Sequence, residues 1–558
     1  MNSNRWIIAF CFFFLGFQIP QLVAQEPPNI LVIIADDMGF SDIGAYGSEI
    51  ETPNLDRLAK NGLRYSQFYN AARCSPTRAS LLTGKYPHQT GIGNMMRDRG
   101  HPSYRGDLNE ESVTIAEVLR EGGYSTFMSG KWHVTKQTDQ FREWLSAEEQ
   151  KNTSKHNWPM QRGFEKFFGT IHGAGSYFDP ATLCMGNDPV PAGKGFYYTD
   201  AISDQAVNFI AESAKDKPFF GYIAYTAPHW PLHALEEDIA KYKGRYNNGW
   251  DVLREERLTR LHEAGIIDKQ WLLSTRDERV PAWGQAENKA WRARAMEVYA
   301  AQVDRMDQGI GRIIRQLEKD GRLENTVIFF LSDNGGCAEF ITEKWPHSLH
   351  MPEKTAEGRQ IVRGNNPEVM PGPELTYQSY GVGWANASNT PFRLYKHYIH
   401  EGGISTPLIV HWPKGVKKRR QVRAQVGHVK DIMATCLDIS GVSYPQLFNG
   451  RTITPHEGVS LLPSFRKDTD IPNELYWEHH GNRGVRSGNW KLVAEQKKGW
   501  ELYDLSTDRV ETQDLAAKHP EVLADMTGKY KQWAKRVGVV KDIGKKAKKE
   551  KKKIKKNN

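Results

Sequence analysis

Two acidic pairs follow two apolar runs of the sequence, each close to the point where the run ends. Asp36-Asp37 comes directly after residues 30–35, and Asp333-Asn334 follows residues 327–331 with one serine between them. Carboxylate and amide oxygens suit a hard divalent cation, Ca²⁺ or Mg²⁺, better than zinc or copper. An aspartate also commonly caps the next segment, so either pair alone would be read as structural. Two such pairs together favour a metal site.

Basic side chains follow two further apolar runs. Residues 125–128 lead into Lys131 and His133, and residues 219–225 lead into His229. If these runs are parallel strands, their carboxyl ends meet at the edge of the sheet where ligands bind in open α/β folds. A lone lysine or histidine is more often a solvated or packed side chain. Four runs that end in ionisable groups nevertheless predict one shared site.

A cysteine segment supplies the candidate nucleophile. From Cys74 to Gly84 the chain reads CSPTRASLLTG, in which Pro76 and the pair Leu81-Leu82 predict a helix that begins near the cysteine. The positive end of a helix dipole favours both a nucleophile and a bound anion at that position. The triplet Cys-x-Pro-x-Arg is weak evidence alone, but the longer string between the acidic pairs is more specific.

Alternation of strands and helices predicts an α/β domain around a largely parallel sheet. A further strand is expected at residues 407–410, and apolar residues spaced by three or four predict helices at residues 113–120 and 293–319. The charged insert at 232–291 is predicted to be helical. Residues 335–395 are predicted to form a functional loop. After Gly441 the pattern changes to that of a smaller α+β domain with an antiparallel sheet, and its expected elements are strands at 474–477, 490–493 and 501–504 and a helix at 521–537.

The segment Cys74–Gly84 resembles the signature of the type I sulfatases, the arylsulfatase-like and formylglycine-dependent enzymes of the alkaline-phosphatase-like superfamily. The similarity extends over nearly all of residues 28–535. It implies a large, mostly parallel sheet flanked by helices, as in alkaline phosphatase, plus the smaller C-terminal domain. Besides the cysteine segment, the matching residues are Pro28-Asn29-Ile30 through Asp36-Asp37, Gly130-Lys131-Trp132-His133, Ala227-Pro228-His229, Ser332-Asp333-Asn334-Gly335-Gly336, and Lys396 five residues before Glu401-Gly402-Gly403.

This resemblance implies that a separate maturation enzyme oxidises Cys74 to formylglycine (3-oxoalanine). One hydroxyl of the hydrated aldehyde then attacks sulfur, and loss of a proton from the other expels sulfate. The implied cation is Ca²⁺ rather than Mg²⁺. Its implied ligands are Asp36, Asp37, Asp333, Asn334 and the oxygen of residue 74. In the implied mechanism Arg78 holds the residue-74 alkoxide, Lys131 and Lys396 neutralise sulfate oxygens, His133 takes the proton from the second hydroxyl, and His229 binds the substrate and donates to the leaving alcohol.

The predicted activity is therefore that of a sulfuric ester hydrolase acting on a small-molecule or oligosaccharide sulfate ester. One alternative is a phosphonate monoester or phosphodiester hydrolase of the same superfamily, and another is a non-catalytic protein that binds sulfated glycans. Aromatic side chains within residues 335–395 suit either a sugar ring or an aryl group. They are Trp345, Tyr377, Tyr380 and Trp384. After His133 and after Gly403 the chain departs from the common family pattern, which leaves the pocket undefined.

The first 24 residues have the layout of a secretory signal peptide. Arg5 precedes an apolar stretch at residues 6–17, and Ala24 ends the segment with a small residue. The stretch is short for a membrane span, although an uncleaved anchor is the alternative. We therefore expect a periplasmic or secreted protein, cleaved near Ala24, without stable membrane insertion. The remaining four cysteines are scattered and contain no CxxC, which argues against a disulfide framework or a thiolate zinc site.

The formal net charge of +9 comes from the two ends of the chain. Residues 541–558 contain ten lysines against Asp542 and Glu550, and Arg5 adds one further charge, so residues 25–540 are neutral. A neutral body argues against nucleic acid as a partner. The lysine-rich tail is predicted to be disordered, and the more specific alternative is that it binds a polyanion. The expected units are a signal peptide at 1–24, a catalytic domain at 25–441, an α+β domain at 442–540 and the tail at 541–558.

Overall fold

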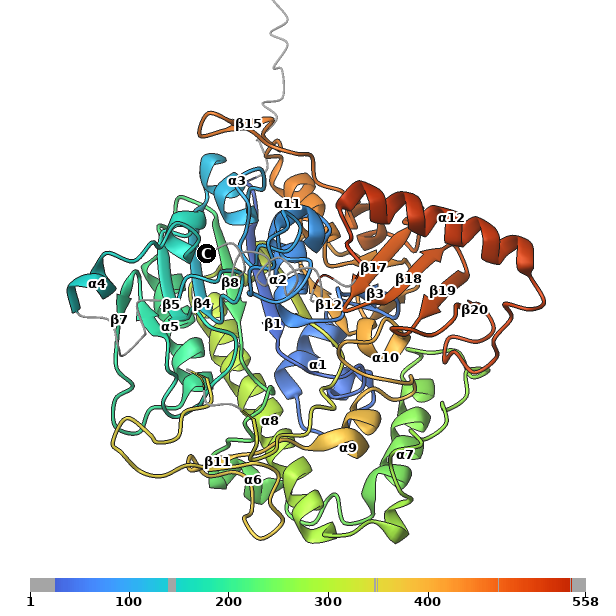
Figure 1. The fold of residues 1–558 in the computed structure, drawn as a ribbon. Helices are drawn as coiled ribbons and strands as arrows, with labels where there is room; N and C mark the ends of the chain where they lie inside the picture. Colours follow the sequence, from blue (N-terminus) through green and yellow to red (C-terminus); the bar gives the residue numbers. More distant parts are fainter. Residues whose placement is uncertain are drawn as a thin grey trace, which may run out of the picture.

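A ten-stranded sheet forms the centre of the computed structural model in Figure 1, which describes residues 26–138, 147–345, 348, 350–469, 471–541 and 543. The expected signal peptide and nearly all of the lysine-rich tail lie outside these residues. Strand β1 (Asn29–Ala35) runs parallel to β8 (Phe219–Ala224) on one side and to β9 (Thr326–Ser332) on the other. Strand β4 (Ser125–Gly130) runs parallel to β8. The prediction of a large, mostly parallel sheet is confirmed.

Both faces of this sheet are buried, which explains why its central strands read as continuous apolar runs. Leu31 and Ile33 of β1 face the core on which α5 (Tyr198–Glu212) and α8 (Lys289–Lys319) pack. Val32 faces the opposite core with side chains of α2 (Cys74–Thr83), α3 (Ile115–Glu121) and α11 (Asp431–Ser440). The sheet therefore forms the middle layer of a three-layer domain (Figure 1).

The other elements of this domain are short and include further strands of the large sheet and the helices on its second face. Strand β12 (Leu408–His411) was expected and runs antiparallel to β9. None of the helices in the described ranges is both long enough and apolar enough to cross a membrane. The remaining elements are η1 (Gly44–Tyr46), α1 (Pro53–Lys60), β2 (Leu63–Tyr65), β3 (Phe68–Tyr69), α2 (Cys74–Thr83), η2 (Pro87–Thr90), α3 (Ile115–Glu121), α4 (Ala147–Lys151), η4 (Pro159–Arg162), β5 (Lys166–Thr170), β6 (Leu183–Met185), β7 (Asp188–Pro189), η6 (Leu323–Asn325), β10 (Val362–Arg363), β11 (Thr376–Tyr377), α10 (Glu401–Ile404), β13 (Gln421–Arg423), β14 (Gly427–His428), α11 (Asp431–Ser440), β15 (Leu447–Phe448), β16 (Arg451–Thr452) and η7 (Leu462–Phe465).

Two segments differ from the expectation. The insert at 232–291 forms α6 (Glu236–Lys241), α7 (Gly249–Glu263) and the single turn η5 (Trp283–Gln285), but none of residues 264–282 is helical. The segment at 335–395, expected to be irregular, contains the buried helix α9 (Gly381–Ser388). Its glycine, serine and asparagine residues are weak helix formers, so the helix depends on packing rather than on propensity.

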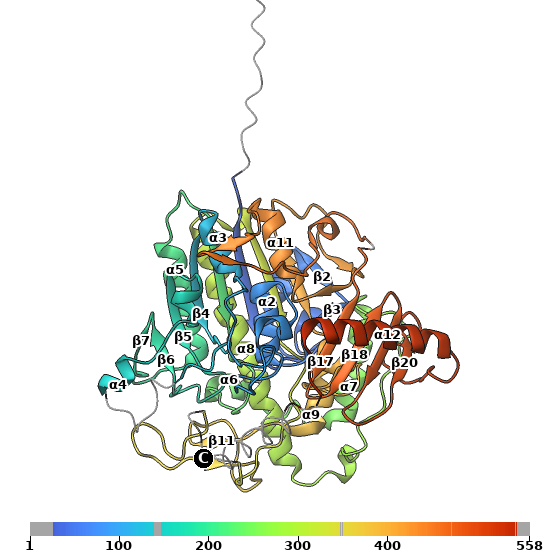
Figure 2. The same cartoon turned by 45° about the horizontal axis from the view of Figure 1, so that its top comes forward.

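A second, four-stranded antiparallel sheet follows the large domain, with α12 (Pro520–Val537) packed against it (Figure 2). Its order is β17 (Leu475–His479), β18 (Asn482–Ser487), β19 (Trp490–Ala494) and β20 (Glu501–Asp504). Three of the strands and the helix were expected. Strand β18 was not, because its sequence NRGVRS is polar and contains glycine.

A buried ion network joins this sheet to the large domain. Lys491 of β19 contacts Glu401 and Glu511, each at 2.7 Å, and all three side chains are fully buried. Arg509 contacts the other oxygen of Glu401 at 3.1 Å. Burial alone would raise the pKa of the Glu401 carboxyl, but Lys491 and Arg509 outweigh burial and lower the pKa to about 2. Glu401 lies five residues after Lys396, so the network fixes the loop that carries this lysine.

Replacement of Lys491 by methionine should destabilise the protein by about 3–5 kcal/mol, because it leaves two carboxylates buried without their shared cation. Urea denaturation of the two proteins measures this difference. Lys498 pairs with Glu495 but its side chain is 63% exposed, so Lys498→Met is the matched control and should cost about 1 kcal/mol or less. Equal costs for the two variants would contradict a structural role for the network.

Candidate active site

The acidic pairs lie side by side at the carboxyl edge of the large sheet, because β1 and β9 are neighbours. Asp36, Asp37, Asp333 and Asn334 are all buried. The Asp37 backbone N–H donates to Asp333 Oδ1 at 3.1 Å, and Asn334 Nδ2 donates to Asp37 Oδ1 at 2.7 Å. The two pairs therefore form one connected group, as the sequence predicts.

Cys74 is the first residue of α2, at the position where the sequence predicts the helix to begin. Arg73 before it is extended, with φ −155° and ψ 149°. The thiol is buried, and burial raises its pKa although Lys131 and Lys396 lie near enough to lower it. An unmodified thiol at this position is therefore poorly ionised at neutral pH, in contrast to the thiolates of cysteine nucleophiles.

Three buried cations neutralise the three carboxylates of the group. Arg78 donates through Nε and Nη2 to Asp333 Oδ2, at 3.1 and 2.9 Å. Lys131 Nζ contacts Asp36 Oδ2 at 2.5 Å, and Lys396 Nζ contacts Asp37 Oδ2 at 2.7 Å. The cations reach the site from α2, from the end of β4 and from the loop before α10. A divalent cation and a sulfate dianion could enter this site together without changing its net charge.

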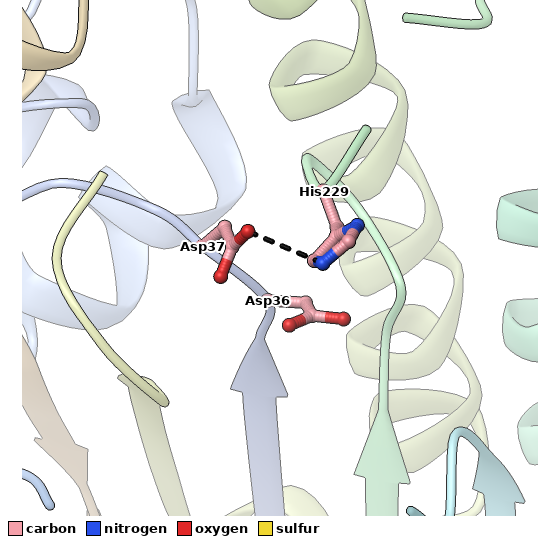
Figure 3. Close-up of side chains that lie close together, drawn as sticks. All are labelled: Asp36, Asp37 and His229. Carbon is pink, nitrogen blue, oxygen red and sulfur yellow. Dashed lines mark ion pairs between the residues drawn. The ribbon is translucent and has the colours of Figure 1, made fainter. Parts of the chain in front are cut away.

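His229 lies beside the acidic group, on the loop after β8 (Figure 3). Its Nε2 is 3.3 Å from Asp37 Oδ2 and 3.3 Å from Lys396 Nζ, and its Nδ1 is 2.6 Å from the carbonyl oxygen of Trp230. Burial lowers the pKa of His229 to about 4, and the charge of Lys396 contributes to the lowering while Asp37 opposes it. The ring is therefore neutral at neutral pH in the free protein.

His133 is a second buried histidine, placed by the end of β4. Its pKa is well below the usual value because of burial and the charge of Lys131. Its Nδ1 is buried and has no hydrogen-bond partner. A neutral imidazole with an unused nitrogen can accept a proton, which is the property that a general base requires.

Two of the oxygen donors at the acidic group are unused. Asp36 Oδ1 and Asn334 Oδ1 are buried without a hydrogen-bond partner. Such groups are costly unless a ligand satisfies them. The ligand atoms of Asp36, Asp37 and His229 also lie within 4.8 Å of one another. The residues present therefore fit a hard cation bound by oxygen, the class of metal that the sequence predicts.

A cavity of about 360 Å³ lies beside this group, and four of the predicted residues line it: Cys74, His133, His229 and Lys396. The sequence did not single out most of the remaining wall, because these residues come from separate loops without a shared motif. They are Arg73, Met95, Met96, Arg97, Lys136, Thr138, His172, Gly173, Ala174, Trp230, Glu339 and His350.

Glu339 is the most strongly connected of these unexpected residues. It accepts hydrogen bonds from Trp230 Nε1 at 2.8 Å and Arg73 Nη2 at 3.3 Å, and it contacts His397 Nε2 at 3.1 Å. Although burial opposes ionisation, Lys396 and His397 lower the pKa of Glu339 well below its usual value. The carboxylate thus holds one wall of the cavity. Its position three residues after Gly336 is the only signal that the sequence offered.

The aromatic residues expected to contact substrate are mostly elsewhere. Tyr377, Tyr380 and Trp384 are buried in the main core and do not line the cavity, so they are not the aromatic side chains that would meet a sugar ring or an aryl group there. Trp384 packs edge-on against Trp250 of α7 at 5.4 Å. Trp345 alone lies near the cavity, edge-on to Trp230 at 5.8 Å.

Gly173 leaves the space that the His133 ring occupies. A Cβ at position 173 would lie 2.1 Å from both Cε1 and Nε2 of His133. Gly173→Ala should therefore displace the ring and lower kcat about 100-fold, since a shift of about 1 Å can cost that much. Steady-state kinetics measures the loss. Gly193→Ala is the control, because a Cβ at position 193 would meet no atom within 4 Å. Unchanged kcat in Gly173→Ala would contradict the importance of this ring position.

Known proteins resemble this chain over nearly its whole length. The family model "Sulfatase" matches residues 28–442, and the model "N-sulphoglucosamine sulphohydrolase, C-terminal" matches residues 392–536. An uncharacterized sulfatase of Schizosaccharomyces pombe is 35% identical, covering 92% of this chain and 95% of the relative. An arylsulfatase of Klebsiella aerogenes is 32% identical, with coverages of 78% and 92%. The crystal structure of Ps i-CgsB in complex with k-i-k-neocarrahexaose has a TM-score of 0.63 at 26% identity, covering 91% of this chain and 93% of that chain.

Proposed function

This chain belongs to the sulfatase family, and we propose that it removes sulfate from sulfated saccharides with a formylglycine made from Cys74. As a sulfatase it hydrolyses sulfate esters to an alcohol and inorganic sulfate. The observation that carries the proposal is the position of Cys74. It begins α2, lines the cavity and lies near Lys131 and Lys396, yet its buried thiol is a poor nucleophile unless it is modified.

The hydrate of formylglycine would supply two hydroxyls on one carbon, one to attack sulfur and one to allow the sulfate to be expelled afterwards. Arg78 would stabilise negative charge on residue 74, because it lies four residues further along the same helix and near enough for its charge to interact with the Cys74 side chain. Lys131 and Lys396 would bind the sulfate oxygens as point charges. A separate maturation enzyme is the implied partner for the oxidation.

His133 and His229 would move the protons. His133, neutral and lacking a partner at Nδ1, is suited to take the proton from the second hydroxyl. His229 must first gain a proton at Nε2, because its Nδ1 faces the Trp230 carbonyl. The negative charge of a bound sulfate ester favours that protonation. The protonated ring could then donate to the leaving alcohol.

We propose Ca²⁺ as the cation, held by Asp36, Asp37, Asp333 and Asn334 with the oxygen of residue 74. The unused oxygens Asp36 Oδ1 and Asn334 Oδ1 support this choice of ligands. Bound Ca²⁺ would polarise the sulfate group and stabilise negative charge on residue 74.

Ca²⁺ at about 100 times its dissociation constant should stabilise the protein by about 2.7 kcal/mol, because it binds only the folded chain. The melting temperature of the metal-free protein, titrated with Ca²⁺ and in parallel with Mg²⁺, measures the effect. Asp36→Asn is expected to weaken the response, whereas Asp216→Asn, outside the proposed ligand set, should not. A larger shift with Mg²⁺ would contradict the assignment of Ca²⁺.

A saccharide is proposed as the alcohol part of the substrate for two reasons. The cavity of about 360 Å³ is within the range of small-ligand sites and is lined by polar and charged side chains together with Trp230, Met95 and Met96. An N-acetylglucosamine-6-O-sulfatase of Bacteroides thetaiotaomicron is 27% identical over 89% of this chain, and the Ps i-CgsB structure contains an oligosaccharide.

Parallel turnover of sulfated mono- and oligosaccharides, an aryl sulfate, an aryl phosphonate and a phosphodiester tests the proposal. The highest kcat/KM is expected for a sulfated saccharide. If the kcat/KM of a phosphorus ester is higher by orders of magnitude, the protein is a phosphonate or phosphodiester hydrolase instead. If no ester is turned over while Cys74→Ala protein binds sulfated glycans as well as the wild type, the protein is a binding protein.

We also propose that the chain is exported after cleavage near Ala24, which N-terminal sequencing of the protein from the periplasm and medium of the native host tests. An intact Met1 on cell-associated protein would contradict cleavage. For the lysine-rich tail we propose contact with a polyanion. Truncation at Gly544 should then reduce retention on dextran sulfate at low salt, and unchanged retention would contradict this role.

A further inference from the structure

Arg73 and Glu339 form an ion pair in the wall of the cavity that contains Cys74. Arg73 Nη2 donates to Glu339 Oε1 at 3.3 Å, and the two side chains are 15% and 19% exposed. Both residues line the same cavity as Cys74 and Lys396. The catalytic steps proposed above use neither of them. The pair therefore offers a hydrogen-bond donor and an acceptor to the molecule that fills the cavity.

The ion pair lies next to the position proposed for the sulfate ester. Arg73 directly precedes Cys74, which begins α2. Lys396, which would bind a sulfate oxygen, is close enough to Glu339 for its charge to lower the pKa of that carboxyl. The part of the substrate that adjoins the ester is therefore expected beside Arg73 and Glu339.

A tryptophan places Glu339 on the side of the leaving alcohol. Trp230 Nε1 donates to Glu339 Oε2 at 2.8 Å, which fixes the orientation of both side chains. The centroid of the Trp230 ring is 4.6 Å from that of His229, the proposed proton donor to the leaving alcohol. The alcohol that meets His229 is thus within reach of the ion pair. A binding group that is ordered before the ligand arrives loses less conformational entropy on binding.

Both members of the ion pair keep unused hydrogen-bonding capacity. A carboxylate has about four lone-pair sites, and Glu339 uses three of them, for Arg73, Trp230 and His397. A guanidinium has five N–H groups, and within the described ranges the Arg73 side chain bonds only to Glu339 and His397. A sugar hydroxyl can accept from one residue and donate to the other. Because the two charges compensate each other, a neutral hydroxyl suits the pair better than a further anion.

We propose that Arg73 and Glu339 bind the ring hydroxyl nearest to the sulfate ester, with Arg73 donating to this hydroxyl and Glu339 accepting from it. This inference rests on the proposed function, because it places the hydroxyl relative to the ester that is cleaved. It narrows the substrate class to sulfated sugars with a free hydroxyl beside the ester. A site built to bind a hydroxyl rejects an analogue without it, because its polar groups then lose a partner.

Calorimetry with Cys74→Ala protein and Ca²⁺ tests the pair without turnover and without dependence on the oxidation of residue 74. The ligands are methyl glycosides of galactose and N-acetylglucosamine sulfated at O4 or O6. Each is compared with a deoxy analogue that lacks the ring hydroxyl nearest to the ester. For the sugar that binds best, the hydroxyl should improve affinity about tenfold, the gain from a hydrogen bond to a charged group.

Arg73→Met and Glu339→Gln should each reduce this advantage to about twofold or less, whereas Arg73→Lys keeps a donor and should retain part of it. A general disturbance of the site would weaken the sugar and its deoxy analogue equally and leave the ratio of their affinities unchanged. Arg294→Met is the matched control, because Arg294 is 20% exposed, pairs with Glu236 at 2.6 Å and does not line the cavity. This variant should keep the tenfold ratio.

The inference is overturned if the hydroxyl improves the affinity of none of the sugars, if no sugar binds, or if the advantage survives in Arg73→Met or in Glu339→Gln. Wild-type turnover of the same sugars separates this outcome from failure of the proposed function. Hydrolysis with the same kcat/KM in the presence and absence of the hydroxyl contradicts only the role of the ion pair. An affinity that depends on the hydroxyl, without hydrolysis, contradicts only the proposed function.

Discussion

Protein carrying Cys74→Ser should release about one equivalent of alcohol from a sulfate ester and then stop. A serine hydroxyl can attack sulfur in the same setting of Arg78, Lys131 and Lys396. It lacks a second hydroxyl on the same carbon, so the sulfated side chain has no internal route to expel sulfate. Rapid-quench kinetics with 4-nitrophenyl sulfate would show the single burst, and mass spectrometry of the residue-74 peptide would show the added sulfate.

A second cysteine substitution controls for a general effect of replacing a buried thiol by a hydroxyl. Cys184 is fully buried in β6, and Cys184→Ser should retain multiple turnover. Continuous turnover by Cys74→Ser at a rate near that of the wild type would contradict the need for two hydroxyls.

Replacement of His229 by alanine should lower kcat/KM far more for substrates with a poor leaving group than for substrates with a good one. A sugar alkoxide is a much stronger base than 4-nitrophenolate, so its departure needs a proton while departure of the phenolate does not. General acid catalysis contributes about 10²–10⁴-fold, and this loss is expected in kcat/KM for a sulfated saccharide. The loss with 4-nitrophenyl sulfate should be less than about tenfold, because no acid is needed there.

The comparison of the two substrates is the informative measurement, because a general disturbance of the site would lower both rates equally. His262→Ala serves as the control, since His262 is partly buried on α7, its ring bonds to the Trp271 carbonyl at 3.2 Å, and it does not line the cavity. An equal loss on both substrates for His229→Ala would remove this residue from the role of proton donor.

Sequence patterns predicted the parts of the fold that depend on burial. Within β1 and β9, residues 30–35 and 327–331 are all apolar and buried, and α2 begins where Pro76 and Leu81-Leu82 place it. Helix α9 was missed because its stability comes from contacts such as that between Trp384 and Trp250, which are 134 positions apart in the sequence and leave no local periodicity.

The candidate site divides in the same way, into residues that a local sequence pattern marks and residues that only tertiary contacts bring together. Each of the ten predicted residues follows a strand, begins a helix or belongs to a motif, and the structure brings them together at one sheet edge. The cavity wall was not predictable, because Arg73, Trp230 and Glu339 meet only through side-chain contacts across separate loops. The aromatic residues at 335–395 were associated with substrate from composition alone. Composition does not distinguish residues that line a pocket from residues that fill the core.

The requirement for formylglycine is open to a direct test by mass spectrometry of the peptide that contains residue 74. Protein made with and without a formylglycine-generating enzyme would be compared for the fraction of aldehyde and for kcat on one sulfate ester. If the aldehyde hydrate is the nucleophile, kcat rises in proportion to the aldehyde fraction and vanishes with it. Full activity in protein whose residue 74 is entirely an unaltered thiol would contradict this mechanism.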